Sequence, residues 1–600
     1  MTMCGDQVDR RRSRGPAIWI TACVLPLLVW TLLPENPRVA GLCHDDGIYT
    51  VLAQSIVDRG VYRAGHYPEP IETAKYPPAV PLIVAACLTV TPNLDAAITA
   101  VRIVNALFLA LALASFWGIL AQEGLGRAAP ALVFAIGWST SSADFARVCM
   151  SEIPYLGVSL FTIYQLLRFE AADERPWRHG AILAGLCFAA FATRSFGVVL
   201  LLTVGLHLVL AKRIPTAIRF GAVLLPMVIA LQLFMSHVAT PAKGYEDVTV
   251  YGLPYSRIFL DSLDWVGATT WTNALHAALA GMQQIWPATA WIPPTGTIGL
   301  IALWALVLLT IVLLCFGARH ESRLATDTLS IRPWHVLILG SIALMLPWPA
   351  SVGRFLVPLV PFFLLMIVRG VERVGGARSV PMTAIVLCLA SISHSIGTRV
   401  VHKENAVAFA GREYDLVGLL DFSKRLGSHT AGQDVIVACT AESLLASHDG
   451  ISGVWGWTIT ADEHVYRNPE SALEFHLGLS KWEWVRRELL AARVLYLEQT
   501  NSKDLPKAHS MMQEMYGVPN PHRRNDDRED LLRDLERDAP KVRDQYRRLG
   551  VTHAVLLLDQ GNPLYEVLLA RLVRRLLDEG RATLVPEVSS ESIQVFRIRP

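Results

Sequence analysis

Two adjacent aspartates, Asp45 and Asp46, follow the first long apolar segment of the chain. Neighbouring carboxylates repel each other, which favours a proton on one of the two unless a cation lies close by. A carboxylate held in this way can act as a general base that takes a proton from a hydroxyl group, and the pair can also bind a divalent cation. The structural alternative is that one of them caps a helix over Ile48–Val57. The residues alone leave these roles open.

A third carboxylate, Glu152, stands just before another apolar segment. Its neighbours offer a structural explanation, because Ser151 can cap a helix whose first turn contains Pro154, and the helix dipole favours an acidic side chain there. The functional interpretation is that Glu152 acts with the aspartate pair, as a catalytic carboxylate or a ligand of the same cation.

Four cations stand near the ends of apolar segments and could bind a phosphate group. Lys75 precedes Tyr76-Pro77-Pro78 and would meet a phosphate as a point charge. Arginine offers a planar fork that matches phosphate oxygens, and Arg147, Arg194 and Arg354 lie in short loops. The alternative is that each long side chain only reaches along the membrane surface to water. Carboxylates for a hydroxyl and cations for a phosphate together indicate sugar transfer from a lipid-linked phosphosugar.

The elements that must position these side chains are membrane helices. Of the 600 residues, 52% are hydrophobic and 18% are charged, against about 25% charged in soluble proteins. Uncharged stretches recur before residue 400 and predict about eleven transmembrane helices, with a shorter apolar helix over Ala79–Val90 at the interface. This composition excludes disordered and collagen-like chains. The net charge of +2 argues against a nucleic-acid partner, and nine scattered cysteines form no CxxC pair.

The distribution of Lys and Arg predicts the orientation. With the N-terminus in the cytoplasm, the inner loops hold seventeen Lys and Arg residues and the short outer loops hold three, as the positive-inside rule requires. The three outer residues are Arg147, Arg194 and Arg354. No clean cleavage site follows the first apolar segment, so we expect it to remain as a membrane helix.

Two domains are expected. Residues 1–400 form the transmembrane domain, with outer loops over 34–102 and 237–297. Residues 401–600 have ordinary soluble patterning, with strands predicted over 434–438, 493–497, 552–558 and 592–598 and helices over 471–492 and 562–579. Alternating strands and helices predict an extracytoplasmic α/β domain.

The order of these motifs resembles that of the C-type (GT-C) membrane glycosyltransferases. The resemblance is to the phospholipid-carrier-dependent branch, which includes protein O-mannosyltransferases and the lipid A aminoarabinose transferase. It covers roughly residues 17–400 and rests on five motifs, which are Asp45-Asp46-Gly47-Ile48-Tyr49, Lys75-Tyr76-Pro77-Pro78, Ala100-Val101-Arg102, Ser151-Glu152-Ile153-Pro154-Tyr155 and Thr193-Arg194. The family's acidic pair is Asp-Glu where this chain has Asp-Asp, and Tyr76 interrupts the family's Lys-Pro-Pro pattern.

The resemblance implies an inverting single displacement on the extracytoplasmic face. A sugar would move from a polyprenyl-phosphate donor to a hydroxyl of a glycan, lipid or protein acceptor, and the catalytic base maps onto Asp45 or Asp46. We therefore expect a hexosyl- or pentosyltransferase of the cell envelope, in the bilayer of a bacterial inner or plasma membrane. A divalent cation held by Asp45, Asp46 and Glu152 is the candidate cofactor.

Two other functions remain open. An oligosaccharide ligase or polymerase with a lipid-linked donor would use the same phosphate chemistry. A non-catalytic lipid or solute transporter would instead show internal repeats and charges at mid-membrane, whereas the charges here gather at one rim and no repeat is evident.

Overall fold

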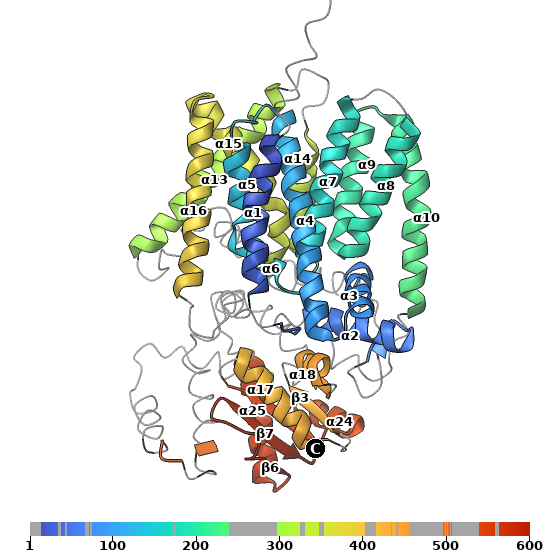
Figure 1. Cartoon of the computed structure of the whole chain (residues 1–600), viewed down its shortest axis with the longest axis vertical. Coiled ribbons are helices and arrows are strands. Elements are labelled where there is room, and N and C mark those ends of the chain that lie inside the picture. Colours follow the sequence, from blue (N-terminus) through green and yellow to red (C-terminus); the bar gives the residue numbers. More distant parts are fainter. Residues whose placement is uncertain are drawn as a thin grey trace, which may run out of the picture. The chain divides into compact units, whose positions relative to one another are not determined.

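The computed structural model describes residues 14–33, 38–41, 45–65, 71–72, 75–171, 176–238, 297–324, 331–346, 353–401, 416–431, 433, 435–439, 442–449, 451–455, 496–497, 500, 502–504, 506, 539–558 and 563–600. Contacts divide the chain into two compact units (Figure 1). The helical unit comprises Met1–Arg38, Tyr76–Met235 and Asn273–Val401, and the second unit comprises Val39–Lys75, Ser236–Thr272 and His402–Pro600. The segment that carries the acidic pair therefore groups with the C-terminal residues.

The helical unit is built mostly from apolar helices of different lengths. They are α1 (Arg14–Leu32), α3 (Ala79–Val90), α4 (Leu94–Gln122), α5 (Ala129–Gly137), α6 (Thr140–Ala146), α7 (Glu152–Ala171), α8 (Pro176–Thr193), α9 (Val198–Leu210), α10 (Ile214–Val238), α13 (Thr297–Leu324), α14 (Pro333–Met345), α15 (Val360–Gly375) and α16 (Ser379–Val401). Among the described residues, three helical segments are long and apolar enough to cross a membrane, Leu94–Gln122, Ile214–Met235 and Arg354–Gly375. The predicted number of about eleven spans stays a prediction.

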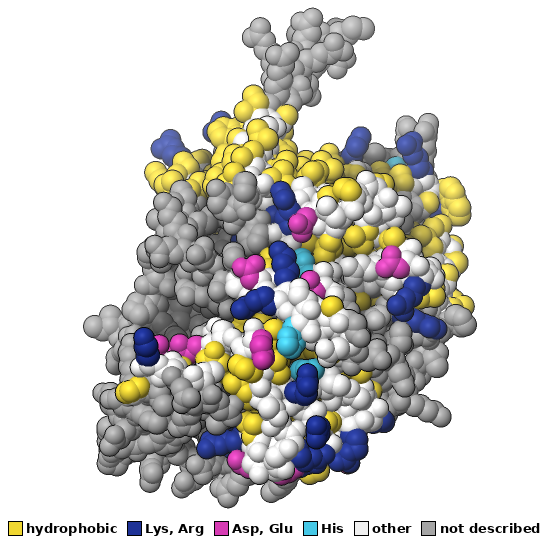
Figure 2. Space-filling model, turned by 60° about the horizontal axis from the view of Figure 1, so that its bottom comes forward, with side chains coloured by type: hydrophobic (Ala, Val, Ile, Leu, Met, Phe, Trp, Pro, Cys, Tyr) yellow, Lys and Arg dark blue, Asp and Glu magenta, His cyan; other side chains and the backbone are white. Residues whose placement is uncertain are grey.

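Close packing in the helical unit centres on α4 and α7. A β-carbon added to Gly157 of α7 would lie 2.7 Å from the backbone oxygen of Phe108 of α4, so the two helix backbones touch there. Small residues permit such an approach between membrane helices. The helices of this unit expose large apolar side chains, which include Leu202, Ile218, Leu225, Leu233, Leu339 and Met382. Apolar side chains gather along the upper part of the view in Figure 2. Such a surface fits a lipid environment.

Charged groups at the C-terminal end of α4 join helices that are distant in sequence. Glu123 lies 3.4 Å from Arg332, just before α14, and 3.7 Å from Arg369 of α15. Arg369 also pairs with Glu372 at 2.6 Å. Arg102, near the other end of α4, lies about 30 Å away along the helix axis at 1.5 Å per residue.

The second unit contains a mixed sheet of five described strands. The strand order is β4 (Ser452–Trp455), β3 (Ile436–Cys439), β5 (His553–Leu557), β7 (Ile593–Ile598) and β6 (Ala582–Leu584). Strands β4, β3 and β5 are parallel, and β7 runs antiparallel to β5 and β6. The predicted strands over 434–438, 552–558 and 592–598 coincide with β3, β5 and β7.

Two other elements predicted in the C-terminal region, the strand over 493–497 and the helix over 471–492, are not found as described elements. Tyr496 and Leu497 are helical, so the part of the predicted strand over 493–497 that the structure describes is not a strand. The predicted helix over 471–492 lies outside the described residues.

Helices α17 (Leu416–His429), α18 (Glu442–Asp449), α24 (Ala539–Leu549) and α25 (Pro563–Asp578) complete the described part of the α/β fold (Figure 1). Helix α25 packs on the sheet through Leu568, Leu572 and Leu576, which recur every four residues and are buried. The buried carboxylate of Glu566 accepts a 2.8 Å hydrogen bond from the backbone N–H of Leu557 at the end of β5. This bond fixes the start of α25 against the strand before it.

Candidate functional site

The acidic pair begins helix α2 (Asp45–Arg59) in the second unit. Asp46 is fully buried, and its Oδ2 accepts a 3.0 Å hydrogen bond from the backbone N–H of Gly41, five residues earlier. Asp46 therefore ties the first turn of α2 to the backbone at Gly41. Asp45 is 9% exposed. Asp46 thus supports the local backbone, and the two aspartates differ in exposure.

Lys75 belongs to the second unit too, at the end of the segment Val39–Lys75. Its side chain is 8% exposed, and the following Tyr76 is fully buried. A lysine that only reached along the surface to water would be more exposed. The burial fits a cation held inside the protein, and its role as a phosphate ligand stays a prediction.

Glu152, Arg194 and Arg354 come together in the helical unit. Arg194 Nη1 lies 2.8 Å from Glu152 Oε1, and Arg354 Nε lies 4.0 Å from the same oxygen. Glu152 has no exposed side-chain surface, while the side chains of Arg194 and Arg354 are 8% and 34% exposed. The cluster therefore has a buried acidic centre and a rim that reaches solvent at Arg354, with a net charge of +1.

Glu152 and Arg194 form a close ion pair without the geometry of a hydrogen bond. Three atoms of this pair make no aligned hydrogen bond with any residue that the structure describes: both carboxylate oxygens of Glu152 and Nη1 of Arg194. Buried polar atoms are nearly always hydrogen-bonded, and exceptions gather where a ligand, water or ion completes the set. The buried ion pair thus leaves the hydrogen bonding of Arg194 Nη1 and of both Glu152 oxygens incomplete among the described residues.

Local sequence explains why these side chains meet. Glu152 is the first residue of α7, and Arg194 stands in extended backbone (φ −153°, ψ 129°) between α8 and the short 3-10 helix η1 (Ser195–Gly197). Gly197 permits this tight break, because an added β-carbon would lie 2.7 Å from the backbone oxygen of Ala190. Arg354 belongs to a second 3-10 helix, η4 (Gly353–Leu359), ahead of α15.

An aromatic side chain that the sequence did not mark lies between the two arginines. The guanidinium of Arg194 lies 4.7 Å from the ring centre of Phe355, and that of Arg354 lies 5.7 Å from it. Phe196 stacks against the same ring at 5.4 Å. Cations over an aromatic face are stabilised by its quadrupole. No spacing rule links residues 196 and 355, so only the fold could identify Phe355.

Arg147 has a different environment. Its side chain pairs with Asp144 at 3.2 Å, three residues earlier. Its backbone oxygen accepts a 2.9 Å hydrogen bond from Arg102 Nε, and Arg102 Nη1 donates to the Thr31 oxygen at 2.7 Å. Arg102 is thus a buried brace between α4, the end of α1 and the segment before α7. The sequence carried a signal for it, because a charge inside an apolar helix is expensive.

A metal site of three ligands is not formed by the described part of the chain. No group of three His, Cys, Asp or Glu side chains gathers there in a way that could hold an ion. The divalent cation expected from Asp45, Asp46 and Glu152 stays a prediction, and the chemistry below is derived from this chain's own side chains.

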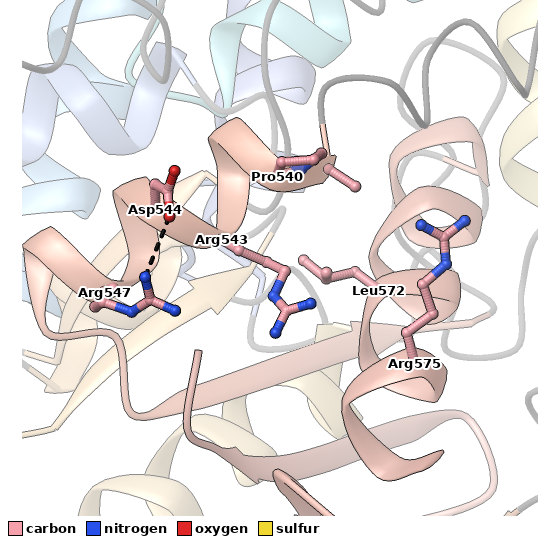
Figure 3. Close-up of a pocket in the computed structure, with 7 residues that line it drawn as sticks. Pro540, Arg543, Asp544, Arg547, Leu572 and Arg575 are labelled. Carbon is pink, nitrogen blue, oxygen red and sulfur yellow. Dashed lines mark hydrogen bonds and ion pairs between the residues drawn. The ribbon is translucent and has the colours of Figure 1, made fainter. Parts of the chain in front are cut away.

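The second unit also has an arginine-lined pocket of about 210 Å³ between α24 and α25 (Figure 3). Two of its three arginines, Arg543 and Arg547, have acidic partners. Arg543 donates to both oxygens of Glu579 at 3.0 and 2.8 Å and lowers the pKa of that carboxyl group. Arg547 pairs with Asp544 at 3.3 Å. Because these charges are largely neutralised, the pocket is a weaker candidate for anion binding than the Arg194 cluster.

Comparison with known proteins identifies similar solved structures. No family model and no curated protein matches the chain. ArnT from Cupriavidus metallidurans bound to undecaprenyl phosphate is 11% identical, with 97% of this chain and 98% of that one covered and a TM-score of 0.41. The oligosaccharyltransferase AglB from Archaeoglobus fulgidus, with a dolichol-phosphate, is 10% identical over 77% and 65% of the two chains, with a TM-score of 0.45.

The arabinofuranosyltransferase AftD from Mycobacteria is 13% identical, over 97% of this chain and 40% of that one, with a TM-score of 0.42. All three are GT-C glycosyltransferases, the class that the sequence motifs resemble.

Proposed function

We propose that this protein is a membrane glycosyltransferase that moves a sugar from a polyprenyl-phosphate donor to an acceptor hydroxyl on the extracytoplasmic face. The observation that carries the proposal is the Glu152–Arg194–Arg354 cluster, in which a buried carboxylate holds two arginines. A phosphate is the ligand whose charge and geometry suit two neighbouring guanidinium groups. The motif order supports the same reaction class, and two similar solved structures are complexes with a lipid phosphate.

The reaction is a single displacement. The acceptor oxygen attacks the anomeric carbon while Asp45 takes the hydroxyl proton. The bond between that carbon and the phosphate oxygen breaks, and its electron pair leaves with the polyprenyl phosphate. Attack from the face opposite the leaving group inverts the anomeric configuration. We assign the base to Asp45 because it is 9% exposed, whereas Asp46 is fully buried.

Negative charge develops on the leaving phosphate, and preorganised cations lower the free energy of that transition state. Arg194 Nη1 is a buried donor with no aligned acceptor among the described residues, and a phosphate oxygen would complete its hydrogen bonding. Glu152 contacts both arginines and orients them. Lys75 and Arg147 are further candidate phosphate ligands, although Arg147 pairs with Asp144.

The test is a transfer assay with the purified full-length chain in lipid nanodiscs. Synthetic polyprenyl-phosphate monosaccharides are supplied with candidate acceptors, and mass spectrometry follows glycosylated acceptor and released polyprenyl phosphate. We expect both products in equal amounts. A transporter would leave the donor intact, and an oligosaccharide ligase would consume only lipid-diphosphate oligosaccharides, so either result would replace the proposed function.

Replacing the cluster's arginines by lysine tests the phosphate contact. Lys keeps the charge but lacks the planar fork, so Arg194→Lys and Arg354→Lys should each lose about 1.5–3 kcal/mol of a charge-assisted contact. That corresponds to roughly 10- to 150-fold in the rate with lipid donor. The matched control is Arg332→Lys. Arg332 also has a carboxylate partner, at 3.4 Å, and an aromatic ring, at 5.9 Å, with a side chain 30% exposed.

We expect the control to transfer sugar at the parent rate. Equal rates for Arg194→Lys, Arg354→Lys and the parent, at equal protein abundance, would show that the arginines are structural only.

A further inference from the structure

Helix α18 of the C-terminal residues holds Ala40 and Gly41, which precede the acidic pair. The backbone N–H of Ala40 donates a 3.1 Å hydrogen bond to Nε2 of His448, near the end of α18. Ala40 is fully buried. Since Nε2 accepts this bond, the His448 ring carries its proton on Nδ1. The contact joins residues 408 positions apart in the chain.

Gly41, the next residue, is fitted against the same helix. Its φ of +100° lies in the region that favours glycine, and an added β-carbon would stand 2.7 Å from the Cα of Leu444 and 2.8 Å from its nitrogen. These are backbone atoms, so no side-chain rotation relieves the clash. The N–H of Gly41 also donates to Asp46 Oδ2. One residue therefore touches both α18 and the acidic pair.

The opposite side of the acidic pair is bound to α18 as well. Ser447 donates from its hydroxyl to the Gly47 oxygen at 3.3 Å. Gln54 of α2 donates to the backbone oxygen of Ser447 at 3.0 Å. Residues before and after Asp45 and Asp46 are thus fixed to one short helix by hydrogen bonds that are buried or partly buried.

We propose that α18 positions the acidic pair for catalysis and that His448 is the main positioning residue. This inference rests on the proposed function, because it assigns the C-terminal domain a role in holding the base. A general base must lie within hydrogen-bond reach of the proton it takes, and an error of about 1 Å in position can cost about 100-fold in rate. A helix that clamps both sides of the pair supplies that precision.

The test combines hydrogen exchange with kinetics on the full-length chain in nanodiscs. In His448→Ala, the amides of Ala40 and Gly41 should exchange about 10-fold faster, because the partly buried hydrogen bond that ties Ala40 to α18 is lost. We expect kcat to fall about 10- to 100-fold, with KM for the lipid donor changed less than about twofold, since the phosphate ligands are untouched. His448→Gln supplies an amide oxygen as acceptor and should restore both exchange protection and kcat.

Gly41→Ala, with Gly60→Ala as its matched control, gives a second measurement. Both glycines have positive φ, +100° and +68°, so both variants carry backbone strain. Nothing lies within 4 Å of a β-carbon at Gly60, whereas at Gly41 it meets Leu444. We expect Gly41→Ala to lower kcat at least 10-fold more than Gly60→Ala does.

Each outcome decides the proposal. Amide exchange at the parent rate in His448→Ala, or equal kcat for the two glycine variants, would show that α18 does not hold Ala40 and Gly41 in place. Faster exchange with an unchanged kcat would show that the clamp exists without a catalytic role. If the parent protein transfers no sugar, the proposed function fails, and the exchange data still show whether the clamp exists.

Discussion

At the scale of single residues, the structure distinguishes the two aspartates. Asp46 is fully buried and accepts the Gly41 N–H, whereas Asp45 is 9% exposed. A substrate hydroxyl reaches the more exposed carboxylate more readily than the fully buried one. The assignment of the base to Asp45 follows from this difference, and it predicts unequal effects of the two conservative substitutions.

We expect Asp45→Asn to lower kcat by about 100-fold or more, because asparagine has the same shape but cannot take the proton. Asp46→Asn should retain activity within about threefold, since its amide oxygen still accepts the Gly41 N–H. Asp46→Ala removes that acceptor and should cost about 1 kcal/mol in stability. Turnover of the lipid donor and thermal unfolding measure the two effects separately. Comparable losses in both Asn variants would mean that the pair acts as a unit.

The sequence identified the charged members of the cluster but not their arrangement. Glu152, Arg194 and Arg354 were recognisable because a charge at the edge of an apolar segment needs an explanation. Their contact with one another, and with Phe355, depends on how α7, α8 and α15 pack. Arg147 has the same sequence signal, yet its side chain pairs with Asp144. Side-chain type and spacing therefore indicate candidates, and tertiary packing determines which of them meet.

At the scale of elements, hydrophobic pattern predicted where helices lie but not which of them cross closely. Helices α13 and α15 meet at two glycines. A β-carbon on Gly317 would overlap the backbone oxygen of Met366, and one on Gly370 would overlap that of Leu313. This reciprocal contact brings the two backbones together, as small residues do in membrane helix pairs. Periodicity alone cannot reveal it, because glycine in a helix has several roles.

Alanine at either crossing glycine should destabilise the helical unit. Forcing a methyl group against a backbone oxygen costs about 1–3 kcal/mol, so Gly317→Ala and Gly370→Ala should each lower the Tm in detergent. The controls are Gly185→Ala in α8 and Gly221→Ala in α10, where nothing lies within 4 Å of the added carbon. Alanine favours a helix over glycine by about 1 kcal/mol, so the controls should match or exceed the parent Tm. Unchanged Tm values at the crossing glycines would contradict the close contact.

At the scale of the whole molecule, the α/β pattern of residues 401–600 could be predicted because strands β3 and β5 are short apolar runs between helices. The grouping of Val39–Lys75 with the C-terminal residues could not be predicted from the sequence. It depends on contacts such as Ala40 with His448 across 408 positions, and long-range hydrogen bonds leave no local pattern. The orientation of the chain, by contrast, is a property of the loops and can be predicted from charge alone.

We expect the N-terminus in the cytoplasm and residues 402–600 outside, because seventeen Lys and Arg residues lie in the inner loops against three in the short outer ones. Gly126→Cys, at an exposed position after α4, and Asp578→Cys, at the exposed end of α25, provide two reporter positions. A membrane-impermeant maleimide applied to intact cells, followed by peptide mapping, should label residue 578 and leave residue 126 unmodified until the membrane is permeabilised. Mapping by peptide separates both reporters from the native cysteines. The reverse pattern would place Glu152 and its arginines at the cytoplasmic face, where the proposed transfer could not use a donor presented outside.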